Sequence, residues 1–395
     1  MLAGLSVEVV TKPDSPEFWS GWNNLVRKYG SNPFLLQGFV EYYSRASSLG
    51  RWTPQLILLK AKGDLLGAVA LKTRGHFGVR TSTQLLPGVY GTDFVSNPDY
   101  LEELVLGTLK LVFGKLRCQF LDLTLPTESR SLTLLTKTCD GLGLKLEASP
   151  LKWHHREHSV LRVEGTWDEY RKGRGGNFVR HFRKIEGKLT ISGEWQIERL
   201  VADGPEAAAK VSVVENNSWK VDWRNARRIK EDPDLKAFLE FWRFNPHEET
   251  DCPRVWLLEL NGEPIAYTIS LQLNGIAMLC KTSYDARYAK LYPGEYVQNA
   301  AIRDLFRPHE VSSIDFLTPL PYHRRWTTER LTRERVGVSR TVPILTDLAT
   351  ALERNRLFMS TYKSLRGFRS GEDISGGKAS ELPGKPGIAA PEPSS

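Results

Sequence analysis

The chain has 395 residues, 41% hydrophobic and 25% charged, so it is long enough for two or three domains with their own cores. A formal charge of +8 and a pI near 9.2 favour anionic partners, among which nucleic acid, CoA phosphates and an acidic surface fit equally well. No apolar run is long enough to span a membrane, and the N-terminus lacks the basic and apolar regions of a signal peptide. We therefore expect a cytoplasmic protein without a membrane span.

Cysteine and histidine spacing argues against a metal site. The chain has four cysteines far apart in sequence and no C-x-x-C pair: Cys118, Cys139, Cys252 and Cys280. Such spacing is typical of reduced thiols. His154, His155 and His158 cluster in "KWHHREH", but no Cys or Asp completes a ligand set, so a polar strand edge or loop is the better interpretation. The sequence predicts no bound metal.

In chain order, the first predicted elements are a helix and a β-hairpin, and the same pair returns later. "EFWSGWNNLVRKYG" predicts a helix, and Leu56–Lys72 predicts two strands around a turn at Gly63. In the second half, Pro233–Phe244 predicts a helix and Val255–Leu271 a hairpin around Asn261-Gly262. One recurring hairpin can arise by chance, so the hairpins alone do not establish a repeat.

The elements after each hairpin strengthen the repeat. A helix follows, and then a short strand with a similar ending, "FLDLTLP" (Phe120–Pro126) in the first half and "SIDFLTP" (Ser313–Pro319) in the second. Matched order of hairpin, helix and Asp-bearing strand indicates two duplicated α/β domains with a mixed (α+β) sheet. We place the domains at 1–150 and 151–369. The segment 370–395 is rich in Gly, Pro and Ser, so we predict a disordered tail there.

A basic segment, Arg171–Thr190, lies between the two predicted domains. Its apolar residues recur at helical spacing, and basic residues occupy another face of the same predicted helix: Phe178, Phe182, Ile185 and Leu189 against Arg180, Lys184 and Lys188. A solvated helix face and a surface that captures a phosphorylated ligand or an RNA backbone are both consistent with this pattern.

A second helix signal begins at Pro293-Gly294, directly after the aromatic and charged run "SYDARYAKLY". Pro is tolerated at a helix start because its missing N–H would have no partner there. Gly lets a ligand approach the backbone, and free N–H groups at a helix N-terminus bind anions. An ordinary loop-to-helix turn is the alternative from these two residues alone.

Several motifs of both halves together resemble a known family. In the second half these are "SYDARYAKLYPGEYV", "SIDFLTPLPYHRRW" and "ENNSWKVDW", and in the first half "NPFLL" and "TDF". They resemble the GNAT-type acyltransferases of the CelD/BioF2-like, cellulose-biosynthesis-associated family, over roughly residues 5 to 350. The motifs depart from that family at Val221, at His323 and over Leu317–Pro319. That family is similar in turn to the Fem-type peptidoglycan-bridge aminoacyltransferases.

The resemblance implies two tandem GNAT-like domains and a donor site in the second. In GNAT folds the central strands separate, pantetheine lies in the gap, and the pyrophosphate sits on the N-terminus of the following helix. The resemblance therefore implies that acetyl-CoA or another acyl-CoA binds at Tyr292, Pro293, Gly294 and Glu295. The equivalent helix start of the first half carries acids that would repel a phosphate, Asp99, Glu102 and Glu103. We expect only the second half to bind the donor.

Acyl transfer needs a base, and the resemblance offers candidates. Glu215 is predicted to share a helix face with Trp219, although an exposed helix acid is the alternative. Asp315 is expected at a strand end, where Asp122 occupies the matching place of the first half and suggests a shared structural role. Asp285 can act as a base or cap its loop, and His323 is the fourth candidate base. The residues expected to bind the acceptor are Trp219, Lys220, Tyr284, Tyr322, Arg324 and Arg325. For Tyr322, Arg324 and Arg325, a solvated basic loop is the alternative.

The sequence thus predicts an N-acyltransferase that moves an acyl group directly from acyl-CoA to an amine or hydroxyl. The expected acceptor is a small molecule, a sugar or a cell-envelope or polysaccharide precursor. A Fem-type aminoacyltransferase, with the basic helix contacting tRNA, is one alternative. Another is a non-catalytic protein that binds nucleic acid or polysaccharide, since "SWKVDWRNARRIK" interleaves aromatic and basic residues.

Overall fold

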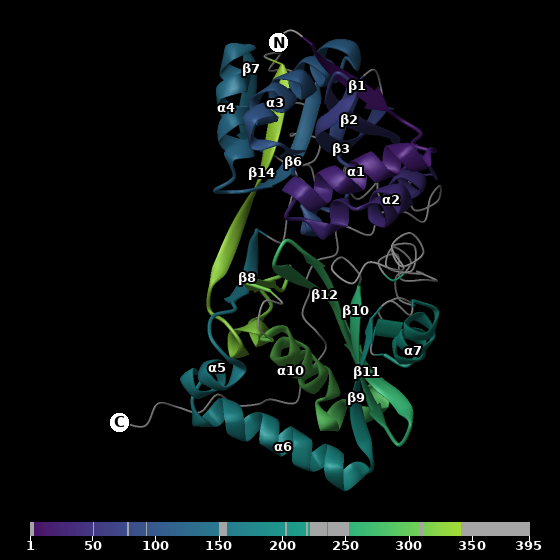
Figure 1. Cartoon of the computed structure of the whole chain (residues 1–395), viewed down its shortest axis with the longest axis vertical. Helices are drawn as coiled ribbons and strands as arrows, with labels where there is room; N and C mark the ends of the chain where they lie inside the picture. Colours follow the sequence, from purple (N-terminus) through teal and green to yellow (C-terminus); the bar gives the residue numbers. More distant parts are fainter. Residues whose placement is uncertain are drawn as a thin grey trace, which may run out of the picture. The chain divides into compact units, whose positions relative to one another are not determined.

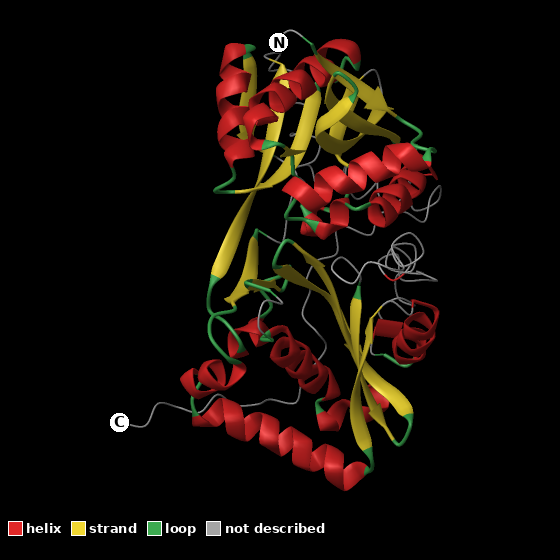
Figure 2. Ribbon diagram, viewed as in Figure 1, coloured by secondary structure: helices red, strands yellow, loops and turns green. Residues whose placement is uncertain are grey.

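A computed structural model describes residues 4–340 except 50, 77–78, 92, 150–155, 202–203, 219, 222–234, 236–252 and 308–310. The described residues form a mixed α/β fold in which helices cover both faces of a large sheet (Figures 1 and 2). No helix among them is long and apolar enough to cross a membrane. Trp219, most of the helix predicted over Pro233–Phe244 and the predicted tail lie outside the described residues.

The first half alternates strands with four α-helices. Its strands are β1 (Leu5–Val10), β2 (Thr53–Ala61), β3 (Asp64–His76), β4 (Val79–Gln84), β5 (Val95–Ser96), β6 (Phe120–Pro126) and β7 (Leu144–Ala148). Its helices are α1 (Pro16–Tyr29), α2 (Gln37–Leu49), α3 (Leu101–Lys110) and α4 (Arg130–Gly141), with a π-helical turn at Leu111–Lys115 and 3₁₀ turns at Pro33–Leu35, Gly88–Tyr90 and Pro98–Tyr100.

The second half repeats this kind of alternation. Its strands are β8 (Glu157–Arg162), β9 (Trp195–Val201), β10 (Arg254–Leu260), β11 (Glu263–Leu273), β12 (Ile276–Tyr284), β13 (Ser313–Asp315) and β14 (Arg330–Arg340). Its helices are α5 (Trp167–Gly173), α6 (Gly176–Ser192), α7 (Gly204–Asn216) and α10 (Pro293–Leu305), with 3₁₀ turns η5 (Ala286–Leu291) and η6 (Pro321–Arg325).

The two halves share one strand arrangement. In each, four antiparallel strands lead to a parallel pair that a helix connects, β4 and β6 through α3, and β12 and β13 through α10. An antiparallel strand then extends each set: β14 pairs with β6, and β8 pairs with β13. Because β8 also pairs with β14, fourteen strands of the described chain join in one sheet. The predicted mixed α/β fold class is confirmed.

Both predicted hairpins are confirmed, and their turns share a backbone conformation. Lys62 and Gly63 have φ of 50° and 94°, and Asn261 and Gly262 have φ of 53° and 79°. Two successive positive φ angles define the type I′ turn, whose twist matches that of antiparallel strands. A glycine at the second position adopts this conformation without steric penalty, which explains why the sequence signal was reliable.

The basic segment predicted to be helical, 171–190, contains the end of one helix and most of the next, with a break between them that was not predicted. α5 ends at Gly173 and α6 begins at Gly176, because Gly175 between them has φ of 81°, outside the helical region. The rest of the prediction is confirmed, since the predicted apolar stripe is buried: Phe178, Phe182, Ile185 and Leu189.

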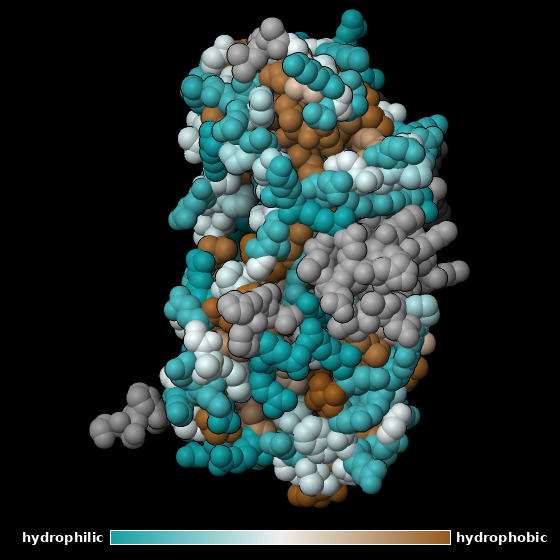
Figure 3. Space-filling view, viewed as in Figure 1, coloured by the Kyte–Doolittle hydropathy of each residue, from teal (hydrophilic) through white to brown (hydrophobic). Residues whose placement is uncertain are grey.

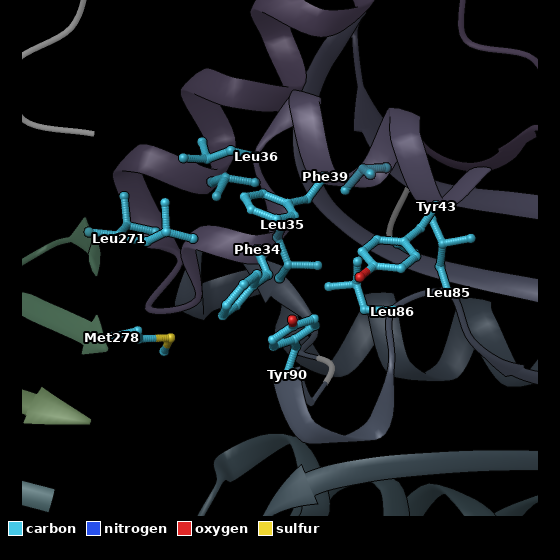
Figure 4. Close-up of a cluster of buried hydrophobic side chains, with 14 of the residues drawn as sticks. Phe34, Leu35, Leu36, Phe39, Tyr43, Leu85, Leu86, Tyr90, Leu271 and Met278 are labelled. Carbon is cyan, nitrogen blue, oxygen red and sulfur yellow. The ribbon is translucent and has the colours of Figure 1, made fainter. Parts of the chain in front are cut away.

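One hydrophobic cluster joins the two halves. Figure 4 shows Leu271 and Met278 of the second half facing Phe34 and Tyr90 of the first, whose rings stack at 3.8 Å. The side chain of Asn274 also donates to the carbonyl of Gly30 (2.6 Å), at the C-terminal end of α1. Residues on this face of β11 and β12 therefore lie against the first half, whereas the opposite face carries α6 and α10.

Candidate active site

Strands β12 and β13 separate after three residue pairs, the last of which is Met278 with Asp315. β13 ends there, but β12 continues to Tyr284 with pairing only to β11 among the described strands. The β11–β12 register shifts at Cys280, which is an extra residue in β12 and therefore a β-bulge. We call this parting of the strands after Met278 and Asp315 the fork.

The N-terminus of α10 follows the fork and has no side-chain cap. Pro293 is the first helical residue, as predicted, and Tyr292 before it adopts the left-handed conformation (φ 56°, ψ 42°). Gly294 is buried against Tyr284, where an added Cβ would lie 2.9 Å from the Tyr284 Cδ1 atom. The backbone N–H groups of an uncapped first turn, together with the helix dipole, suit an anion.

Four basic side chains surround this N-terminus; we call them the basic cluster. They are His181, Lys184 and Lys188 of α6 and Arg325 of η6. Lys188 Nζ donates to the Lys290 carbonyl (2.9 Å) and lies 4.7 Å from the centre of the Tyr292 ring. Figure 3 shows mainly hydrophilic residues along α6, with hydrophobic residues in separate patches. Net positive charge therefore accompanies the free helix N-terminus.

Glu295 is an acid in the first turn of α10, but its charge is compensated. Its Oε2 atom accepts from Arg325 and lies 2.8 Å from His181 Nε2. Burial, and then the charges of Arg325, Lys184 and Lys188, lower the pKa of His181. The carboxylate is thus occupied by its ion pair, which leaves the backbone N–H of Glu295 rather than its side chain to meet an anion. His181 was not predicted as a site residue, because Glu295 and Arg325 are over a hundred residues away in sequence.

The equivalent place in the first half is bridged by a side chain. The β4–β6 ladder ends with the pair Thr83 and Asp122, and the next residue, Gln84, accepts from the backbone N–H of Thr124 (2.9 Å). Its amide nitrogen also donates to the Leu86 carbonyl (3.2 Å). The residue that follows the last pair in the second half is Leu279, which has no polar atoms for such a bridge. The contrast agrees with a donor site in the second half only.

Glu215 is the last but one residue of α7 and is 0% exposed, so the alternative of an exposed helix acid is wrong. Its carboxylate accepts from the Tyr267 hydroxyl and pairs with Lys220 (3.2 Å) and Lys281 (3.6 Å). α7 ends at Asn216, and Trp219, which was predicted to share a helix face with Glu215, lies outside the described residues. Lys220 also donates to the Thr282 carbonyl of β12 (3.1 Å).

Asp285 caps the turn after β12. It is fully buried, and its carboxylate accepts from the backbone N–H of Arg287 (2.9 Å) and pairs with the guanidinium of the same residue (2.7 Å). The capping alternative predicted for Asp285 is therefore observed. A carboxylate committed to these contacts has little freedom to accept another proton.

Asp315 lies at the fork and contacts His158 of β8, which was predicted to lie on a polar strand edge or in a loop. One of its oxygens accepts from the backbone N–H of Leu317 (2.6 Å) and lies 3.2 Å from His158 Nδ1. Burial opposes ionisation of Asp315, but the contact with His158, the charge of Arg333 and the Leu317 N–H together lower its pKa. Asp122 makes the corresponding contact with Arg335 of β14 (2.6 Å), so each aspartate pairs with a basic side chain of the antiparallel strand beside it, as the shared structural role considered for them predicts.

The η6 turn after the fork mixes buried and exposed residues. Tyr322 is 42% exposed and Arg324 is also exposed, whereas His323 is buried with its ring 4.6 Å from that of Phe316. The Arg324 carbonyl accepts from the guanidinium of Arg174 (2.8 Å), which anchors the turn to the end of α5. Two of the predicted acceptor-binding side chains, Tyr322 and Arg324, are therefore accessible.

Acid should destabilise the protein through His323. Burial, partly offset by the bond to the Thr318 carbonyl, lowers the pKa of His323 from 6.5 to about 4. The neutral ring is then favoured in the folded chain, and this contribution is present above pH 6.5 and lost as the pH falls through 4. We expect the loss of this contribution to lower the unfolding free energy by ~2–3 kcal/mol between pH 7.5 and pH 4.5. Urea unfolding of the wild type and His323→Asn at both pH values measures the difference; equal acid losses would contradict the assignment.

Comparison with known proteins places this geometry in a family of domains. Residues 176–326, from α6 to the end of η6, match the family model of an acetyltransferase (GNAT) domain. These residues have the GNAT fold, and both the fork and the N-terminus of α10 lie among them. Among curated protein sequences, none matches the chain.

Solved structures extend the likeness to both halves. A structure of FemX has a TM-score of 0.59 at 11% identity and covers 87% of this chain and 100% of that one. A structure of L-PGS from Bacillus licheniformis has a TM-score of 0.52 at 10% identity and covers 87% of this chain and 98% of that one. The C-terminal domain of a putative lysylphosphatidylglycerol synthetase from Agrobacterium fabrum has a TM-score of 0.50 at 10% identity. The match covers 85% of this chain and 95% of that one. At such identities the likeness concerns the fold.

Proposed function

We propose that the chain is an acyltransferase that moves an acyl group, acetyl in the simplest case, from acyl-CoA to an amine or hydroxyl. The observation that carries this proposal is the uncapped N-terminus of α10, directly after the fork and beside the basic cluster, within a GNAT domain. Backbone N–H groups there would bind the pyrophosphate, over Tyr292–Glu295. Pantetheine would lie along the part of β12 that β13 leaves unpaired.

Direct transfer is the simplest reaction at this site. The acceptor would attack the thioester carbonyl with no covalent enzyme intermediate, and a positioned base would contribute ~10²–10⁴-fold. Of the predicted carboxylate bases, Glu215 is engaged in a buried ion pair and Asp285 pairs with the exposed guanidinium of Arg287, whereas Asp315 lies at the fork. We therefore favour Asp315 and its contacts as the reacting region. Tyr322 and Arg324 would meet an acceptor, together with Tyr284, Lys220 and Arg325 if their present contacts rearrange.

The acceptor class follows from the resemblance alone. Within the GNAT fold we propose a CelD/BioF2-like enzyme of the cytoplasm, which would acylate a small molecule, an amino sugar or another cell-envelope or polysaccharide precursor. Trp219, adjacent to the described Lys220, is proposed to stack on that acceptor.

A Fem-type aminoacyltransferase is the second candidate. Its support is the similarity in fold to FemX over both halves and the exposed basic residues of α6, Arg180, Arg183 and Lys184. In that case the donor would be an aminoacyl-tRNA, and the basic face would contact its phosphates.

One experiment separates the candidates. Calorimetric titration of the full chain with acetyl-CoA should show binding, and acetyl-CoA at 100 times its Kd should add about 2.7 kcal/mol to the unfolding free energy. Titration with aminoacylated and deacylated tRNA forms the second arm. The Fem-type candidate predicts tight binding that depends on aminoacylation, with a log–log salt slope of roughly −0.7 to −0.9 per phosphate contacted. Binding of RNA or polysaccharide without thiol release from acetyl-CoA would favour a non-catalytic protein.

A further inference from the structure

His158 of β8 is a buried histidine with only one ring nitrogen engaged. Its side chain is 1% exposed, and Nδ1 lies 3.2 and 3.3 Å from the two carboxylate oxygens of Asp315. Nε2 is buried and has no hydrogen-bond partner among the described residues. A buried polar nitrogen without a partner destabilises the folded chain, so the protein keeps a basic group at a cost in stability.

The pair of His158 and Asp315, here called the dyad, is held at the fork. Asp315 is the β13 residue that pairs with Met278 in the last rung of the β12–β13 ladder. It also pairs with Val160 on β8, two residues from His158, so alternation along the strand puts His158 and Val160 on one face. The dyad is thus fixed by strand pairing on both sides rather than by a loop.

The face of the sheet that carries the dyad is opposite to α10. Met278 packs into the cluster formed with α7 and the first half, whereas its neighbour Ala277 packs into the cluster under α10. In the parallel ladder Asp315 pairs with Met278, and Ile314 pairs with Ala277. Ile314, like Ala277, packs into the cluster under α10, so Asp315 lies on the opposite face with Met278. A donor anchored at α10 would therefore pass its acyl end through the fork toward the dyad.

We propose that His158 is the general base of the acyl transfer, with Asp315 as its positioning residue. This inference rests on the proposed function. Nε2 takes a proton from the neutral acceptor amine or hydroxyl as the lone pair of the acceptor attacks the thioester carbonyl carbon. The C–S bond then breaks, its electron pair leaves on the CoA sulfur, and the proton held by His158 passes to that thiolate. Because the ring is buried, it reacts only with groups enclosed at the fork, which excludes bulk water.

His158→Asn is the sharpest test, because the Asn amide can still donate to Asp315 where Nδ1 does but has no basic nitrogen in place of Nε2. The probes are acetyl-CoA and, as acceptor, hydroxylamine, with thiol release above the rate without acceptor as the measured rate. We expect kcat to fall by ~10²–10⁴-fold with KM and the calorimetric Kd for acetyl-CoA within about twofold of wild type. Asp315→Asn should lower kcat less, again at unchanged Kd.

The outcomes distinguish this inference from the proposed function. Wild-type turnover in a folded His158→Asn variant that binds acetyl-CoA would make the dyad a structural pair and leave the acyltransferase proposal intact. No binding of acetyl-CoA by the wild type would overturn both. A second measurement is used if the variant does not fold or if no thiol is released. It is nitrogen-15 NMR of ring-labelled histidine in the wild type, which reports whether His158 Nε2 carries a proton. An unprotonated His158 Nε2 at neutral pH that responds to acetyl-CoA supports the base, and a permanently protonated Nε2 overturns it.

Discussion

Gly294→Glu is expected to lower the affinity for acetyl-CoA by about 100-fold or more, or ~2.7 kcal/mol in binding free energy. The new carboxylate would stand at the N-terminus of α10, where the helix dipole and the basic cluster otherwise favour the phosphates of the donor. The substitution also has a steric part, because a Cβ at this position would lie 2.9 Å from Tyr284 Cδ1 and the ring must move. Calorimetric titration of wild type and variant measures the change.

Two controls separate charge from shape in this experiment. Gly294→Ala introduces the same Cβ without the carboxylate, so the difference between the Ala and Glu variants isolates the charge. Gly21→Glu adds the same acid to α1 at a glycine where an added Cβ would meet nothing within 4 Å, and it should leave binding unchanged. Unaltered affinity in a folded Gly294→Glu variant would remove the N-terminus of α10 as the donor site.

Local signals in the sequence predicted the elements near the site well. The start of α10 was predicted from Pro293-Gly294, and both hairpins from their Gly63 and Gly262 turns, because each depends on a few adjacent residues. The break between α5 and α6 was missed although Gly175 carries it. Glycine is compatible with both a helix and a positive φ, so periodicity alone favoured one continuous helix.

The roles of the ionisable residues depended on partners far away in sequence. Glu215 pairs not only with the nearby Lys220 but also with Lys281 on β12. Asp315 contacts His158, which is 157 residues away in sequence. Strand pairing creates these contacts, and a motif of adjacent residues carries no information on them. For the same reason only Lys184 and Lys188 of the basic cluster were recognised together, without His181 and without Arg325 as the counter-charge of Glu295.

The difference between the two halves at their separating strands also depends on contacts between distant residues. From the sequence, the donor was expected in the second half because acids lie at the start of α3, although Glu295 is likewise an acid in the first turn of α10. The structure supplies a stronger reason, since Gln84 bridges the separating strands in the first half. A signal for it existed in the sequence: Gln84 and Leu279 each follow the last residue of their parallel ladder, and only one of them is polar.

Glu215→Gln is expected to lower the unfolding free energy by ~3–5 kcal/mol. The substitution keeps volume but removes the negative charge beside Lys220 and Lys281, whose side chains are only 19% and 8% exposed. Since Glu215 itself is fully buried, solvent cannot replace the lost charge. Urea unfolding of the wild type and variant measures the loss.

Variants of the same helix and of the same cluster sharpen this test. Glu206→Gln makes the identical change in α7 at a half-exposed acid that pairs with Lys210 (3.1 Å), and it should cost less than about 1 kcal/mol. Lys281→Met in the Glu215→Gln background should restore part of the stability, because it removes a buried ammonium that has lost its counter-charge. If Glu215→Gln is instead as mild as Glu206→Gln, the carboxylate is not needed for folding. A sharp loss of turnover in such a stable variant would then return Glu215 to the role of general base that its sequence context predicted.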